Sequence, residues 1–168
     1  KTLCSSCSLR ELCLPVGLLP NEFAQLDAVI RQSRRLKKGE YLFRTGEPFA
    51  SLFAIRAGFF KTTVASQDGR DQVTGFFMSG ELIGMDGICS HVHSCDAVAL
   101  EDSEVCELPF THIEELGHNI PSLRSHFFRL MSREIVRDQG VMLLLGNMRA
   151  EERLAAFLLN LSQRLYSR

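Results

Sequence analysis

The sequence has no excess of positive charge, because its 19 lysine and arginine residues are balanced by 20 aspartate and glutamate residues. Proteins that bind nucleic acid carry clustered positive charge, which attracts the phosphate backbone. The sequence also has no internal repeat, no low-complexity segment and no uninterrupted apolar run of the ~20 residues that a membrane-spanning helix requires. We therefore expect no membrane role, and any DNA contact should come from outside these 168 residues.

Disulfide bonds are also not expected, although the chain contains six cysteines. The length, the 45% hydrophobic content and the lack of a signal-like leader are typical of a protein in a reducing compartment. A chain of this size and composition can bury one sizeable core without cross-links. We predict a globular, cytoplasmic protein.

Four of the cysteines suit a single metal site. Cys4, Cys7 and Cys13 are separated by two and five residues, and Cys106 comes 93 residues after Cys13. Thiolates are soft ligands, which both a tetrahedral Zn²⁺ ion and an iron–sulfur cluster prefer. The pattern predicts a metal site that ties an N-terminal arm to the body of the chain, and it leaves both metals open.

The spacing of apolar residues and glycines predicts an α+β fold. A short helix is expected to begin at Pro20, because apolar residues recur at helical spacing from Phe23 to Ile30. Between residues 36 and 110, short β-rich runs alternate with glycines, and Asp68-Gly69 marks a hairpin tip. Such short connections permit only antiparallel pairing, so we predict a double-stranded β-roll. The expected strands are 41–44, 52–56, 59–64, 73–77 and 104–108.

A long helix is predicted from Pro121, after an Asn119 cap, to about Gly146. Its residues include a series with alternating three- and four-residue spacing, which is the a/d pattern of a coiled-coil seam. We predict that this helix forms a dimer interface, the alternative being a helix buried within one domain. The predicted interface residues are Phe128, Met131, Ile135, Asp138, Met142 and Leu145.

Asp138 is the charged member of this predicted seam. In a parallel homodimer it would face its own copy, and the two carboxylates would repel each other by ~1 to 4 kcal/mol. Dimerisation would then be marginal, and a modest free-energy change elsewhere could switch it. In the alternative interpretation, Asp138 lies at the edge of the seam and is solvated.

A further amphipathic helix is predicted from Ala150 to Arg168, and nothing in these residues is expected to cover its apolar side. This pattern predicts a further C-terminal module. We therefore expect an arm at 1–19, a sensory β-roll with flanking helices at 20–118, a dimerisation helix at 119–147 and the start of a missing domain at 148–168.

The order and spacing of these segments resemble the CRP/FNR superfamily of transcription regulators, and specifically its oxygen-sensing FNR branch. The matching segments extend over almost the whole chain. They are the cysteine arm with Leu14-Pro15, and residues 38–40, 52–56, 74–76, 105–110, 129–132 and 150–157.

The resemblance implies that Cys4, Cys7, Cys13 and Cys106 hold a 4Fe-4S cluster. It also implies that oxygen degrades the cluster, the arm loosens and a homodimer separates into monomers. DNA binding would belong to a helix-turn-helix domain of the intact protein, which these residues do not include.

The resemblance also implies a contact between a surface hairpin and RNA polymerase. Asp68, Gly69, Arg70 and Asp71 resemble a loop through which this family contacts RNA polymerase, although the charge of Arg70 departs from the expected pattern. A solvated turn is the alternative interpretation of the same residues.

Particular residues bear on three other possible functions. Gly80-Glu81 resembles part of a CRP-type cyclic-nucleotide pocket, but no arginine lies between Arg70 and Arg124 to bind the phosphate. A zinc-binding structural domain would use the same four thiolates as the cluster. A separate metal site requires that one strand face presents Cys89, His91, His93 and Cys95. No catalytic set accompanies these residues, so an enzyme is not predicted.

Overall fold

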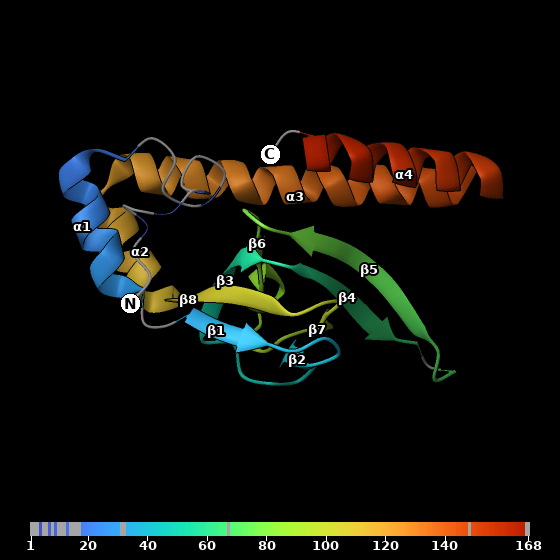
Figure 1. The fold of residues 1–168 in the computed structure, drawn as a ribbon, viewed down its shortest axis with the longest axis horizontal. Helices are drawn as coiled ribbons and strands as arrows, with labels where there is room; N and C mark the ends of the chain where they lie inside the picture. Colours follow the sequence, from blue (N-terminus) through green and yellow to red (C-terminus); the bar gives the residue numbers. More distant parts are fainter. Residues whose placement is uncertain are drawn as a thin grey trace. The chain divides into compact units, whose positions relative to one another are not determined.

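The structure is a computed structural model that describes residues 4, 7, 9, 13, 18–30, 33–66, 68–147 and 149–166, with the backbone alone for residues 20 and 143–147. The chain divides into two compact units, Lys1–His126 and Phe127–Arg168. Figure 1 shows strands and short helices in the first unit, and helical structure in the second. Helix α3 (Pro121–Asn147) begins in the first unit and continues into the second.

The described part of the first unit contains two four-stranded sheets, with strand orders β1-β8-β3-β6 and β2-β7-β4-β5. All named strand pairs are antiparallel, so the predicted fold class, an α+β antiparallel β-roll, is confirmed. The sequence did not predict β1, β6 and β7. The bounds are β1 Ser33–Leu36, β2 Tyr41–Phe43, β3 Ser51–Ala57, β4 Phe59–Ala65, β5 Asp71–Met78, β6 Leu82–Ile83, β7 Asp96–Ala99 and β8 Ser103–Pro109.

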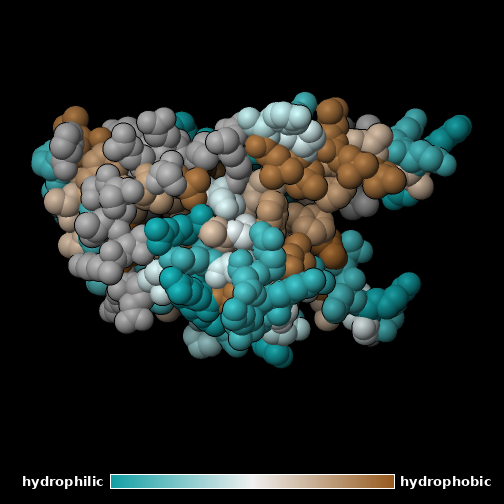
Figure 2. All heavy atoms as spheres, viewed as in Figure 1, coloured by the Kyte–Doolittle hydropathy of each residue, from teal (hydrophilic) through white to brown (hydrophobic). Residues whose placement is uncertain are grey.

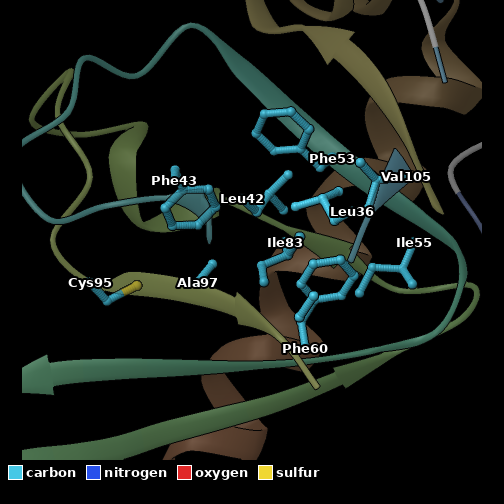
Figure 3. Packing of buried hydrophobic residues seen from close by; sticks show 11 residues of the cluster. Leu36, Leu42, Phe43, Phe53, Ile55, Phe60, Ile83, Cys95, Ala97 and Val105 are labelled. Atoms are coloured by element: carbon cyan, nitrogen blue, oxygen red, sulfur yellow. The ribbon is translucent and has the colours of Figure 1, made fainter. Parts of the chain in front are cut away.

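The hydrophobic core is formed by side chains from both sheets. Figure 3 shows Phe60, Ile55 and Val105 close together among the labelled core residues. Each large apolar side chain that leaves water on folding contributes about 1.5–3 kcal/mol. The cluster consists of Leu36, Leu42, Phe43, Phe53, Ile55, Phe60, Ile83, Cys95, Ala97, Ala99 and Val105.

The helices predicted from Pro20, Pro121 and Ala150 begin at those residues. Helix α1 (Pro20–Val29) is capped by Glu22, whose carboxylate accepts the Leu19 N–H at 2.7 Å. A proline at the first helical position costs no hydrogen bond, which suits both α1 and α3. Helix α2 is Phe110–Asn119, helix α4 is Ala150–Tyr166, and a short 3-10 helix, η2, is Met85–Gly87. Among the described residues, no helix is long and apolar enough to cross a membrane.

Gly58 lies between β3 and β4 with a φ of +95°, and a Cβ added there would lie 2.1 Å from Ser103 Oγ. Gly39 has a similar φ of +86°, but nothing lies within 4 Å of its added Cβ. We predict that Gly58→Ala lowers the free energy of unfolding by about 3 kcal/mol or more, because it combines strain with a clash. Gly39→Ala should cost about 1 kcal/mol from strain alone. Equal losses in urea denaturation would contradict this prediction.

Candidate metal centre

Cys106 lies on the side of its strand that faces away from the core. It follows Val105 in β8, and successive side chains of a strand point to opposite faces. Val105 belongs to the core cluster, yet Cys106 is only 8% exposed. Parts of the chain outside the sheet therefore cover Cys106. Its neighbours across the sheet are Ser33 on β1 and Ala54 on β3, both of which have small side chains.

The arm cysteines are attached to the folded body through their backbone atoms. The N–H of Cys4 donates to Asp27 Oδ1 in α1 at 2.5 Å. The carbonyl oxygen of Cys13 lies 3.2 Å from His126 Nε2 in α3. Within the arm, the Cys7 N–H donates to the carbonyl of Cys4 at 3.1 Å. Helices α1 and α3 thus hold both ends of the cysteine triplet.

The four thiols influence one another electrostatically. Burial raises the pKa of the Cys4 thiol far above its usual range, and the negative charges of Cys13, Asp27, Cys106 and Cys7 raise it further. Burial also raises the pKa of Cys106, and Cys7 adds to that shift. The thiols therefore share one neighbourhood, in which several thiolates would repel each other without a bound cation.

The thiols are near one another without forming a finished metal site. Among the described residues, no group of three or more His, Cys, Asp or Glu side chains is arranged to hold a metal ion. All six cysteines are described, and none is in a disulfide. The donor set still fits a thiolate-bound metal, because four thiols lie within electrostatic reach and Cys106 has small neighbours.

A positive charge also lies near the thiols. Arg56 on β3 donates from Nη1 to Glu104 Oε1 at 2.7 Å, and this hydrogen bond is the main reason that the pKa of Arg56 is raised. Cys106 and Cys7 raise the Arg56 pKa as well, so the guanidinium is close enough to offset thiolate charge. Sequence reasoning missed Arg56, Asp27 and His126, because each is far in sequence from the cysteines and belongs to no ligand motif.

The second group of cysteines and histidines does not share one strand face. Residues 88–95 form turns and an isolated bridge before β7 begins, and His91 has a φ of +59°. Cys89 and His91 are exposed, whereas His93 and Cys95 are buried. The strand arrangement on which a metal site there depended is therefore not formed.

His93 occupies the region where a nucleotide pocket would need an arginine. Its ring stacks on Phe43 with 3.7 Å between centroids, and its Nδ1 lies 3.3 Å from Asp86 Oδ1. Asp86 Oδ2 also accepts the Ser94 N–H at 2.8 Å. Glu81 accepts the Met78 N–H within its own turn at 3.0 Å. The Asp86 carboxylate beside His93 would oppose phosphate binding there, because like charges repel.

Several predicted interface residues of the second unit are exposed in the single chain. Phe128, Ile135 and Met142 are 59%, 57% and 70% exposed, and they are spaced at intervals of seven residues. Asp138 is exposed and Met131 is partly buried. The side chain of Leu145 lies outside the described residues. Figure 2 shows hydrophobic residues gathered on one visible face of α3 and α4.

The predicted polymerase contact lies on the hairpin between β4 and β5. Gly69 has a φ of +78°, which supports the predicted tip. The guanidinium of Arg70 pairs with the carboxylate of Asp68, which also accepts a hydrogen bond from Ser66. Arg70 and Asp68 thus offset each other's charge, which leaves Asp71 at the start of β5.

Comparisons with known proteins place these observations in a family. The family model "Cyclic nucleotide-binding domain" matches residues 33–119. The chain is 47% identical to "Transcriptional activator protein anr" of Pseudomonas aeruginosa, over 98% of this chain and 68% of that protein. It is 45% identical to "Fumarate and nitrate reduction regulatory protein" of Salmonella typhimurium, over 98% and 66%. The chain thus spans about two thirds of the length of these relatives.

A solved structure shows the same fold. FixK2 from Bradyrhizobium japonicum aligns with a TM-score of 0.73 and 24% identity, over 79% of this chain and 66% of that chain. At this identity the likeness concerns the fold alone.

Two cysteines outside the candidate centre should differ strongly in reactivity. Burial raises the pKa of Cys95 to about 12, with a further contribution from Asp86, whereas Cys89 is exposed. We predict that iodoacetamide modifies Cys89 at least about a hundredfold faster at pH 7.5, because the thiolate is the reactive form. Mass spectrometry of reduced, metal-free protein measures both rates. Comparable rates would show that Cys95 is accessible and ionised.

Proposed function

The chain belongs to the FNR branch of the CRP/FNR superfamily of transcription regulators, and on that premise we propose that it is the sensory and dimerisation part of an oxygen-responsive regulator. The observation that carries the proposal is the attachment of Cys4 and Cys13 to the unit that contains Cys106, through hydrogen bonds to Asp27 and His126. The electrostatic influence of Cys7, Cys13 and Cys106 on Cys4 supports it. These four residues would hold a 4Fe-4S cluster. When bound, the cluster would supply an oxygen-sensitive link between the arm and β8.

The residues around the thiols have separate roles in this proposal. Cys106 is fixed by the pairing of β8 with β1 and β3, so it is the rigid ligand of the set. Cys4, Cys7 and Cys13 come from the arm, and their positions depend on its contacts with α1 and α3. Arg56, which also pairs with Glu104, would offset part of the negative charge of Cys106 and Cys7. The high pKa of Cys4 means that metal binding must displace its proton.

The second unit would dimerise with a second copy of this chain. Exposed apolar residues at heptad spacing, Phe128, Ile135 and Met142, are the support for this step. Asp138 would weaken the dimer by placing two carboxylates in the seam. The cluster-bound first unit would favour the dimer, and loss of the cluster would give monomers.

The remaining functions belong to the intact protein. DNA binding would reside in a helix-turn-helix domain that follows the α4 region, and the dimer would present two copies of it. Asp68, Gly69, Arg70 and Asp71 would provide a contact with RNA polymerase. The relatives named above are regulators and not enzymes, and we propose no catalytic activity for this chain. A cytoplasmic location is part of the same proposal.

Cysteine variants test the ligand set. We predict that Ser substitution of Cys4, Cys7, Cys13 or Cys106 abolishes cluster assembly, because a hydroxyl replaces a thiolate poorly. Cys89→Ser and Cys95→Ser are the matched controls and should retain iron and sulfide after anaerobic preparation. Full cluster content in Cys106→Ser would refute the assignment.

The same preparations separate the two candidate metals. Anaerobically prepared wild-type protein should be brown, with broad charge-transfer absorption that bleaches in air. A colourless protein that contains one zinc ion per chain would instead identify a structural zinc domain.

Asp138 is predicted to set the dimerisation threshold. Asp138→Ala removes ~1 to 4 kcal/mol of like-charge repulsion, which strengthens association by roughly one to three orders of magnitude. The variant should therefore dimerise without a cluster, whereas metal-free wild type should be largely monomeric at micromolar concentration. Analytical ultracentrifugation in air and under argon measures this.

Gln139→Ala is the control for the Asp138 experiment, because Gln139 is exposed and lies outside the predicted seam series. It should behave like wild type. Equal dimer fractions for metal-free wild type and Asp138→Ala would mean that Asp138 is a solvated edge residue.

A further inference from the structure

Two buried polar side chains of the first unit contact the arm on either side of its cysteines. Asp27 of α1 is 9% exposed, and its Oδ1 lies 2.5 Å from the backbone nitrogen of Cys4. His126 of α3 is 4% exposed, and its Nε2 lies 3.2 Å from the backbone oxygen of Cys13. The first and last cysteines of the arm are therefore both held by the body of the unit.

Neither contact involves a sulfur atom. The Cys4 N–H donates to a carboxylate, and the Cys13 carbonyl can only accept, so His126 Nε2 must carry the hydrogen. Both hydrogen bonds use backbone atoms of the cysteines, so these two contacts do not occupy the sulfur atoms. Proteins commonly orient metal ligands through such surrounding hydrogen bonds.

Asp27 and His126 are polar residues at buried helix positions, where apolar residues are more common. Asp27 follows the buried Leu26 in α1, and His126 lies one turn after the buried Leu123 in α3. Burying a carboxylate or an imidazole costs free energy unless it is hydrogen-bonded, so packing alone would favour apolar residues here. The arm backbone supplies a partner for each side chain. Each contact therefore gives a physical reason for a polar residue at that position.

We propose that Asp27 and His126 are positioning residues that dock the arm, so that Cys4 and Cys13 lie near Cys106 independently of cluster binding. The inference rests on the proposed function, because it takes these cysteines as ligands. A docked arm has already lost much of its conformational entropy, so ligand assembly is faster. Losing the cluster would then release the thiols while the arm backbone stays attached. The loosening of the arm on cluster loss would therefore concern its thiols and not its two backbone contacts.

Amide hydrogen exchange of the metal-free, reduced protein tests the docking directly. Asp27→Ala should accelerate exchange of the Cys4 amide by roughly tenfold, the factor expected for a hydrogen bond to a charged group. Asp27→Asn keeps an acceptor oxygen and should retain most of the protection. Gln25→Ala, at an exposed position of α1, is the matched control and should leave the Cys4 amide unchanged.

The contact between His126 and the Cys13 carbonyl can be tested separately. Nitrogen NMR of wild-type His126 should show the Nε2–H tautomer or the imidazolium, and a neutral Nδ1–H tautomer would overturn the docking role without any variant. The Cys13 amide donates to the Leu9 carbonyl at 3.0 Å, within the part of the arm that His126 contacts through the Cys13 carbonyl. His126→Ala should undock this part and so accelerate exchange of the Cys13 amide severalfold, whereas His126→Gln, which retains an N–H donor, should restore its protection. Ser125→Ala is the exposed control on α3.

Cluster uptake distinguishes this inference from the proposed function. Both Ala variants should incorporate iron and sulfide severalfold more slowly than wild type during anaerobic reconstitution, with unchanged protection of the β3 and β8 amides. If wild type incorporates no iron, the proposed function fails, yet fast Cys4 exchange in Asp27→Ala still supports docking. If wild type incorporates a cluster and the Cys4 and Cys13 amides exchange equally in wild type and Ala variants, the docking role is wrong.

Discussion

The alternation of side chains along β8 is the constraint on which the site depends. Val105 enters the core, so Cys106 must lie on the opposite face, between Ser33 and Ala54 of the neighbouring strands. Pairing on both sides fixes the β8 backbone. The Cys106 side chain is short, so its rotation moves the sulfur atom only a little. A site assembled from distant segments needs one such fixed ligand, against which the others are placed.

Electrostatic repulsion would make the thiolate forms of the candidate site depend on a bound cation. Burial and neighbouring thiols raise the pKa of Cys4 and Cys106, which keeps these groups protonated at neutral pH. A metal reverses this preference because its charge stabilises thiolates. Arg56 contributes a nearby positive charge from β3. The crowding that disfavours four bare thiolates would make the proposed cluster a strong link between the arm and β8.

The two units differ in how they dispose their apolar side chains. The first has a closed apolar core between two sheets, whereas the second exposes large apolar residues such as Phe128 and Met142. Exposed apolar surface favours association, and a carboxylate at Asp138 disfavours it. In the proposed mechanism, a balance of this kind would leave the monomer and the dimer close in free energy, so that a small change in the first unit would shift the equilibrium between them.

The sequence alone determined the β-roll and the starts of α1, α3 and α4, because β-rich runs between glycines, helix caps and prolines are local signals. The cysteine spacing is also a local signal, and it predicted the proposed ligands. It did not reveal β1, whose Ser-Arg-Arg-Leu sequence becomes a strand only by pairing with β8. It also could not identify Asp27, His126 or Arg56. Their contacts with the cysteine region join residues far apart in sequence, and only the tertiary structure brings such residues together.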